Sequence, residues 1–101
     1  MGEREIIWTH YADAQLSEAF LNLLEESESL ETTVRVIDEI YRSTEILTTN
    51  PEIYELDELR KNNDGSFRAY EKHTYRVSYQ ITENKIYIIQ VRFARKKPVK
   101  Y

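Results

Sequence analysis

The sequence predicts one α+β domain, residues 1–101, in which two helices cover one face of an antiparallel sheet in the order β-α-α-β-β-β. Two observations predict this class. In the first half of the chain, apolar residues recur at spacings of three and four, which is the period of amphipathic helices. In the second half they alternate with polar residues, as in half-buried strands. The length of 101 residues suits one domain and is too short for two separate cores.

A first strand is predicted to begin near Glu3, because the short apolar run Glu5-Ile6-Ile7-Trp8 lies close to the N-terminus. Thr9 follows as a helix N-cap. A first helix is predicted from Tyr11 to about Glu26. Its buried stripe consists of Ala12, Leu16, Ala19, Phe20, Leu23 and Leu24. These residues lie on one side of a helix and predict a single buried face.

A second helix is predicted from about Glu31, with Ser29 or Thr32 as its N-cap. Its apolar face consists of Val34, Ile37, Ile40, Tyr41 and Leu47. It should end before Asn50-Pro51, because the residue preceding proline is disfavoured in the α region. The apolar residues that follow, Ile53, Leu56 and Leu59, indicate an irregular segment that packs on the core.

Three strands are predicted after the turn Asn62-Asn63-Asp64-Gly65, in which Gly65 is free to take a positive φ. The strands are residues 67–72, 75–82 and 85–93. The last two are joined by the two-residue connection Glu83-Asn84. A meander of this kind leaves one sheet face for the helices and one open to water or a ligand.

Alternation assigns the residues of each strand to a face. In residues 75–82 the apolar core set is Tyr75, Val77, Tyr79 and Ile81, and the open set is Arg76, Ser78, Gln80 and Thr82. In residues 85–93 the core set is Tyr87, Ile89, Val91 and Phe93, although Ile86 and Ile88 break the pattern. Should Arg68 and Lys72 share the open side with Arg76 and Arg92, four cations and Tyr70 would lie on one small face.

Charge divides the chain sharply. Residues 1–60 carry four basic and fifteen acidic residues, a net charge of −11, whereas residues 61–101 carry ten basic and three acidic residues, a net charge of +7. A basic sheet with interleaved aromatic rings suits RNA, because cations meet phosphates and rings stack on unpaired bases. An acidic protein partner fits the same face. The same basic residues are also typical of a solvated sheet edge, whose charges prevent pairing with another chain.

Several classes of function are excluded by what the sequence lacks. It contains no cysteine and two histidines, so disulfides and a structural zinc site are not expected. With two glycines it has no phosphate-binding glycine-rich loop. No apolar run approaches the roughly 20 residues of a membrane span, and the N-terminus does not resemble an export signal. We therefore expect a cytoplasmic protein with no metal, no cofactor and no membrane partner.

The order of several short strings adds a resemblance. They are Ile6-Ile7-Trp8 before the first helix, Asn50-Pro51 after the second, Phe67-Arg68-Ala69-Tyr70-Glu71-Lys72, Tyr75-Arg76-Val77-Ser78-Tyr79-Gln80-Ile81, and Ile86-Tyr87-Ile88-Ile89-Gln90-Val91-Arg92 leading to Arg95, Pro98 and Tyr101. Over essentially its whole length, the chain resembles the RelE/ParE superfamily, the toxins of bacterial type II toxin–antitoxin modules used in plasmid stabilisation. The resemblance implies two helices on a curved antiparallel sheet.

The resemblance also implies a function. RelE-like members cleave mRNA in the ribosomal A site, and by position their reactive residues fall on Arg76, Arg95 and Tyr101. The arginines would stabilise charge on the phosphoryl oxygens while the ribose 2′-OH attacks, and Tyr101 would act as base or stacking group. This metal-independent endoribonuclease is the first expectation. ParE-like members inhibit DNA gyrase without nuclease chemistry, which is the alternative, and a non-toxic interaction domain is a third.

Further residues are expected to contact RNA or a partner protein. They are Arg68, Lys72, His73, Arg92 and Lys96. The expected partners are a cognate antitoxin protein, which would cover the basic sheet face or the helix grooves, together with mRNA on the ribosome or DNA gyrase.

Overall fold

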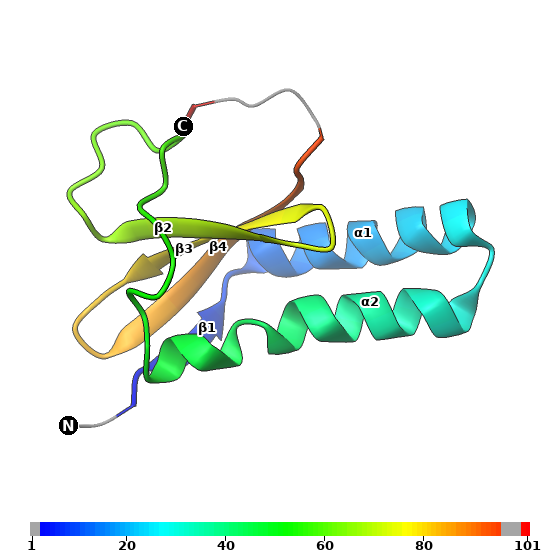
Figure 1. The fold of residues 1–101 in the computed structure, drawn as a ribbon, viewed down its shortest axis with the longest axis horizontal. Coiled ribbons are helices and arrows are strands. Elements are labelled where there is room, and N and C mark those ends of the chain that lie inside the picture. The colour runs from blue at the N-terminus through cyan, green and yellow to red at the C-terminus, as the bar shows by residue number, and fades with distance from the viewer. Residues whose placement is uncertain (1–2, 96–99) are drawn as a thin grey trace.

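The computed structural model describes residues 3–95 and 100–101. The elements follow the predicted order, with one added turn of 3-10 helix, η1. Their bounds are β1 Glu5–Trp8, α1 His10–Ser27, α2 Leu30–Arg42, η1 Glu45–Thr48, β2 Phe67–Lys72, β3 Tyr75–Ile81 and β4 Lys85–Phe93. Both helices lie on the same side of the sheet (Figure 1). The predicted α+β class is confirmed. Within the described residues, no helix is both long and apolar enough to span a membrane.

The helix boundaries follow from local signals. The Thr9 side chain accepts a hydrogen bond from the Ala12 N–H at 3.2 Å and caps α1, as predicted. α1 ends at Ser27, and the capping residue Glu28 takes a left-handed conformation with φ 54°. Ser29 accepts from the Thr32 N–H at 3.1 Å and is therefore the cap of α2. The chain leaves its helical path before Pro51, in agreement with the restriction that proline imposes.

The sheet is mixed rather than fully antiparallel. Its strand order is β1-β4-β3-β2, and β2, β3 and β4 form an antiparallel meander. β1, however, pairs with the first half of β4 in parallel. The prediction of an all-antiparallel sheet was therefore wrong for this one strand. Parallel pairing requires a long connection between the two strands, and the chain between β1 and β4, including both helices, provides one.

A β-bulge divides β4 into two halves of opposite parity. Ser78 pairs with Gln90 whereas Tyr79 pairs with Ile88, so Ile89 is an extra residue with no partner on β3. Ile86 and Ile88 consequently face the helices before the bulge, and Val91 does so after it; all three are buried. The predicted core set was correct for Val91 but wrong for Tyr87 and Ile89, because simple alternation does not anticipate an inserted residue.

Tyrosines attach the segment after η1 to the helix side of the sheet. The Tyr70 ring stacks on Tyr54 with centroids 4.1 Å apart, and its hydroxyl hydrogen-bonds that of Ser43 at 2.7 Å. Burial raises the pKa of Tyr70 to about 12. The Tyr79 hydroxyl donates to the Pro51 carbonyl at 2.6 Å. Tyr70 thus belongs to the core, not to the open face.

The same segment then covers the outer edge of β2. The Ala69 N–H donates to the Glu55 carbonyl at 3.1 Å, and the Asp57 N–H donates to the Phe67 carbonyl at 2.9 Å. Leu56 forms an isolated bridge to Arg68. These bonds protect an edge strand that would otherwise expose unpaired backbone groups, and they place Asp57 beside the open face.

Candidate functional site on the open sheet face

A buried carboxylate organises the open face. Asp57 is 2% exposed, and its Oδ1 accepts a hydrogen bond from Arg76 Nη2 at 2.7 Å. Its Oδ2 accepts one from the Tyr101 hydroxyl. The backbone N–H of Leu59 also donates to Oδ1, at 3.0 Å. Asp57 therefore joins two of the three predicted catalytic residues, Arg76 and Tyr101, into one network.

Tyr101 is held by backbone as well as side chain. Its N–H donates to the Leu59 carbonyl at 2.9 Å, and its carbonyl accepts from the Lys61 N–H at 2.5 Å. The Arg60 guanidinium lies 5.2 Å from the centre of the Tyr101 ring and 3.9 Å from that of Phe67. These contacts dock the end of the chain onto the loop between η1 and β2.

The pKa values of this network set the charge of each group. Burial alone would raise the pKa of Asp57, but hydrogen bonds from Tyr101, Arg76 and the Leu59 N–H hold it below its ordinary value. Burial and the bond to Asp57 raise the pKa of Tyr101 to about 12. At neutral pH Asp57 is therefore an anion and Tyr101 a protonated donor, which does not suit Tyr101 to the role of a base.

Arg76 is a compensated cation. Its side chain is 19% exposed, and the charge of Asp57 lies within hydrogen-bond distance. Arg76 Nε is buried and has no hydrogen-bond partner among the described residues. Arg92 lies opposite Arg76 on β4 and brings a second cation to this face. Arg76 and Arg92 are thus on the open face, as predicted, but Arg76 is neutralised by its neighbour.

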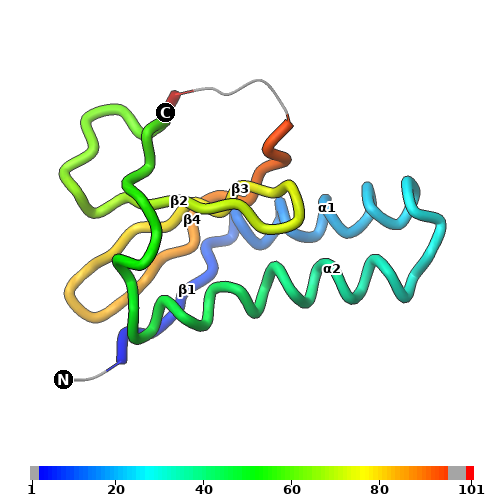
Figure 2. The backbone as a smooth tube through the Cα atoms, viewed as in Figure 1, coloured from blue at the N-terminus to red at the C-terminus, as the bar shows by residue number. Residues whose placement is uncertain are grey.

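Arg95 lies apart from this network. It is exposed in the turn after β4. Within residues 3–95 and 100–101, the bonds that join Asp57, Arg76 and Tyr101 do not include it. Figure 2 shows the labelled C-terminal end beside the loop before β2, whereas the chain leaves β4 at the far end of the sheet. The structure does not bring all three predicted catalytic residues together.

The predicted binding residues are scattered. Arg68 is paired with Tyr79 and therefore lies on the helix side, where it donates to the Tyr54 carbonyl at 2.7 Å and lies 3.5 Å from Glu52. The residues of β2 that share the face of Arg76 are Phe67, Ala69 and Glu71. The expected group of four cations and Tyr70 was therefore wrong, because the parity of β2 is the opposite of the one assumed.

Lys72 and His73 lie at the tip of the β2–β3 hairpin. Lys72 is exposed, and His73 Nε2 lies 2.6 Å from Glu39 Oε1 on α2. The hydrogen bond from His73 lowers the pKa of Glu39. His73 is thus a contact between the hairpin and α2. Lys96 lies outside the described residues.

Two residues of the site were not predicted, Asp57 and Arg60. Asp57 is one of fifteen acidic residues in the first sixty, and nothing local distinguishes it. The one available signal is its position between the apolar residues Leu56 and Leu59, which indicates a segment held against the core. Among the described residues, no group of three or more acidic, histidine or cysteine side chains could hold a metal ion.

Comparisons with known proteins place this geometry in a family. The chain has the fold of a solved structure titled "Chromosomal ParDE TA system from P. aeruginosa", with a TM-score of 0.74, 13% sequence identity, and coverage of 92% of this chain and 98% of that one. No curated protein sequence matches this chain. A family model described as the ParE toxin of the type II toxin–antitoxin system parDE matches residues 6–98. The chain therefore belongs to the ParE toxin family of type II toxin–antitoxin systems.

Proposed function

We propose that this toxin acts by binding and inhibiting DNA gyrase, without cutting RNA. Its place in a toxin–antitoxin module implies a cognate antitoxin as partner, and the ParE family favours gyrase as target. The observation that carries the proposal is the ion pair between Arg76 and the buried Asp57, at 2.7 Å. It neutralises the cation that RNA cleavage would need.

The chemistry of cleavage explains why this observation matters. Attack by a ribose 2′-OH builds negative charge on the phosphoryl oxygens, which must be met by uncompensated cations. Arg76 instead faces a carboxylate, and a phosphate approaching it would be repelled by Asp57. A base is also needed, and Tyr101, with its pKa raised to about 12, keeps its proton at neutral pH. Inhibition by binding requires neither group to be free.

Ribosome-dependent mRNA cleavage remains the second candidate, and one observation favours it. Arg76 and Tyr101 converge on the same carboxylate, and Arg92 lies opposite Arg76. A substrate that displaced the Asp57 segment would meet two arginines and a phenol together. This route requires the bonds of Asp57 to both residues to break before the reaction.

The deciding experiment compares both targets with the same purified toxin. One reaction contains gyrase and relaxed plasmid; the other contains translating ribosomes with a defined mRNA. The proposal expects loss of supercoiling or accumulation of broken DNA, with intact mRNA. New 5′ ends within translated codons and an unaffected gyrase reaction would refute it.

Induced expression in cells supplies the matched variants. The double variant Asp57→Asn/Arg76→Met removes both charges of the buried pair. It should leave growth arrest largely intact if the toxin acts by binding elsewhere, and should abolish growth arrest if Arg76 contacts RNA. Arg35→Ala, which removes an exposed arginine from α2, is the control for loss of one positive charge. Thermal unfolding of both purified variants separates loss of activity from loss of fold.

A further inference from the structure

One stretch of sheet edge has no strand beside it. β1 pairs with residues Lys85–Ile88 of β4 and ends there, whereas β4 continues to Phe93. On that side, no described strand lies beside β4 beyond Ile88. The opposite edge of the sheet is different, because residues 55–57 hydrogen-bond to β2. The second half of β4 is thus, like the outer side of β1, a stretch of sheet edge open to an added strand.

The backbone groups along this edge point outward at alternate residues. The Ala94 N–H donates to the Thr74 carbonyl, so Arg92 and Ala94 direct their N–H groups toward β3. Val91 and Phe93 therefore direct theirs toward the edge. The Val91 N–H is occupied by a side chain, because it donates to Gln15 Oε1 of α1 at 2.7 Å. A side-chain amide here stands where the carbonyl of a neighbouring strand would be.

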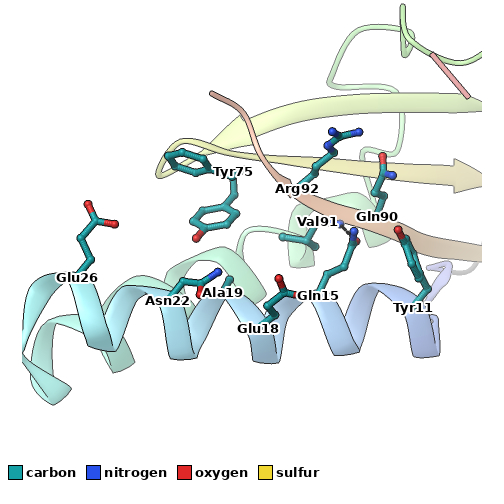
Figure 3. A pocket seen from close by; sticks show the side chains of 11 residues that line it. Tyr11, Gln15, Glu18, Ala19, Asn22, Glu26, Tyr75, Gln90, Val91 and Arg92 are labelled. Carbon is teal, nitrogen blue, oxygen red and sulfur yellow. Dashed lines mark hydrogen bonds between the residues drawn. The ribbon is translucent and has the colours of Figure 1, made fainter. Parts of the chain in front are cut away.

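The edge borders a cavity of about 550 Å³ between α1 and β4. Figure 3 shows Gln15 reaching from α1 to Val91, with Glu18 and Asn22 further along the same helix. Tyr11 and Tyr75 also line this space. The wall formed by α1 is acidic, because Glu18 and Glu26 both line the cavity. Burial, together with the charges of Glu26 and Glu18, raises the pKa of Tyr75.

We propose that the cognate antitoxin inserts an extended segment along residues 89–93 of β4, pairing with the backbone of Val91 and Phe93 and displacing Gln15. A residue opposite Val91 would direct its side chain toward α1, because side chains alternate between the faces of a sheet. There it meets Glu18, and Glu26 lies about two turns further along α1, so this residue is basic. The proposal rests on the toxin–antitoxin assignment and is independent of gyrase as the target.

Hydrogen exchange of the toxin, alone and with the co-expressed antitoxin from the adjacent reading frame, tests the pairing. The Phe93 amide, which has no partner among the described residues, should exchange at least about tenfold more slowly in the complex. The Ala69 amide, already bonded to Glu55, is the internal reference and should change much less. A stable complex in which Phe93 is not selectively protected would overturn the proposal.

Charge reversal tests the acidic wall. Glu18→Lys should weaken antitoxin binding roughly fivefold at low salt, a size typical of reversing one exposed ion pair, and the difference should shrink at about 1 M salt. Glu25→Lys is the matched control, because Glu25 is exposed on the same helix but does not line the cavity. Equal effects of both variants would overturn the proposal. Absence of any complex would overturn it too, whereas failure of gyrase inhibition would leave it untouched.

Discussion

Replacing Asp57 with asparagine tests the network on which the candidate site depends. The substitution keeps the shape of the side chain but removes the charge that compensates Arg76, whose side chain is 19% exposed. Breaking a buried ion pair from one side costs about 3–5 kcal/mol. Since Arg76 retains some contact with water and the new amide would keep one acceptor oxygen, we take the lower end, about 3 kcal/mol. For a domain of this size, that lowers Tm by roughly 12–20 °C.

Urea and thermal unfolding of four proteins measure this effect: the wild type, Asp57→Asn, Arg76→Met and the double variant. Most of the cost arises from the guanidinium left without its anion. The double variant should therefore be more stable than Asp57→Asn alone, and the two single costs should not add. A cost below about 1 kcal/mol for Asp57→Asn, or simple additivity, would refute the reasoning.

The same variant predicts a change in acid stability. The pKa of Asp57 is lower in the folded protein than its ordinary value of 3.8. Its ionised form therefore stabilises the fold above about pH 4, and this contribution is lost as the pH falls below 3.8 through the folded pKa. Stability measured between about pH 5 and pH 2 should decline less steeply in Asp57→Asn than in the wild type.

Three further substitutions test the fold by urea unfolding. Ile88→Ala should lower the free energy of unfolding by about 3 kcal/mol and Ile89→Ala by about 1 kcal/mol, because the bulge buries Ile88 fully. Similar losses for both variants would contradict a bulge at Ile89. Thr74→Gly should stabilise the β2–β3 hairpin by about 0.5 kcal/mol, since a β-branched residue is strained at φ 67°. Gly65→Ala should lower the free energy of unfolding by about 1 kcal/mol. The positive φ of 99° is the sole cause, since an added Cβ would have no atom within 4 Å to clash with.

Local features of this fold were predictable and long-range ones were not. Thr9 and Ser29 cap helices through bonds to residues three positions away, so the sequence contains both partners of each bond. The face on which Arg68 lies is decided by its pairing with Tyr79. Alternation indicates which residues share a face but not which face is buried when polar and apolar residues are mixed, as they are in β2.

The bulge and the Asp57 network were not predicted, because both depend on residues that are distant in the sequence. One inserted residue, Ile89, reverses the parity of everything before it, and a run of isoleucines looks equally apolar in either register. Asp57 acquires its role from Arg76 and Tyr101, which lie 19 and 44 residues further along the chain. Its apolar neighbours Leu56 and Leu59 indicate only that the segment packs on the core, not that Asp57 pairs with Arg76 and Tyr101.

The acidic and basic halves of the chain are brought into contact by the fold. In the sequence, the basic charge of the second half suggested a sheet face that binds RNA or an acidic protein. Instead, acidic residues of the first part pair with basic ones of the second, and the ion pairs are Asp57 with Arg76, Glu52 with Arg68, and Glu5 with Lys85. His73 also hydrogen-bonds Glu39.

Three of these contacts engage residues predicted to meet RNA, namely Arg68, His73 and Arg76. Fewer uncompensated cations mean fewer phosphates neutralised, and the salt dependence of any RNA binding scales with that number. The internal pairing of the two halves therefore weakens the case for a nuclease face built on Arg68, His73 and Arg76. Inhibition of gyrase by binding does not require these cations to be unpaired, so the pairing is compatible with it.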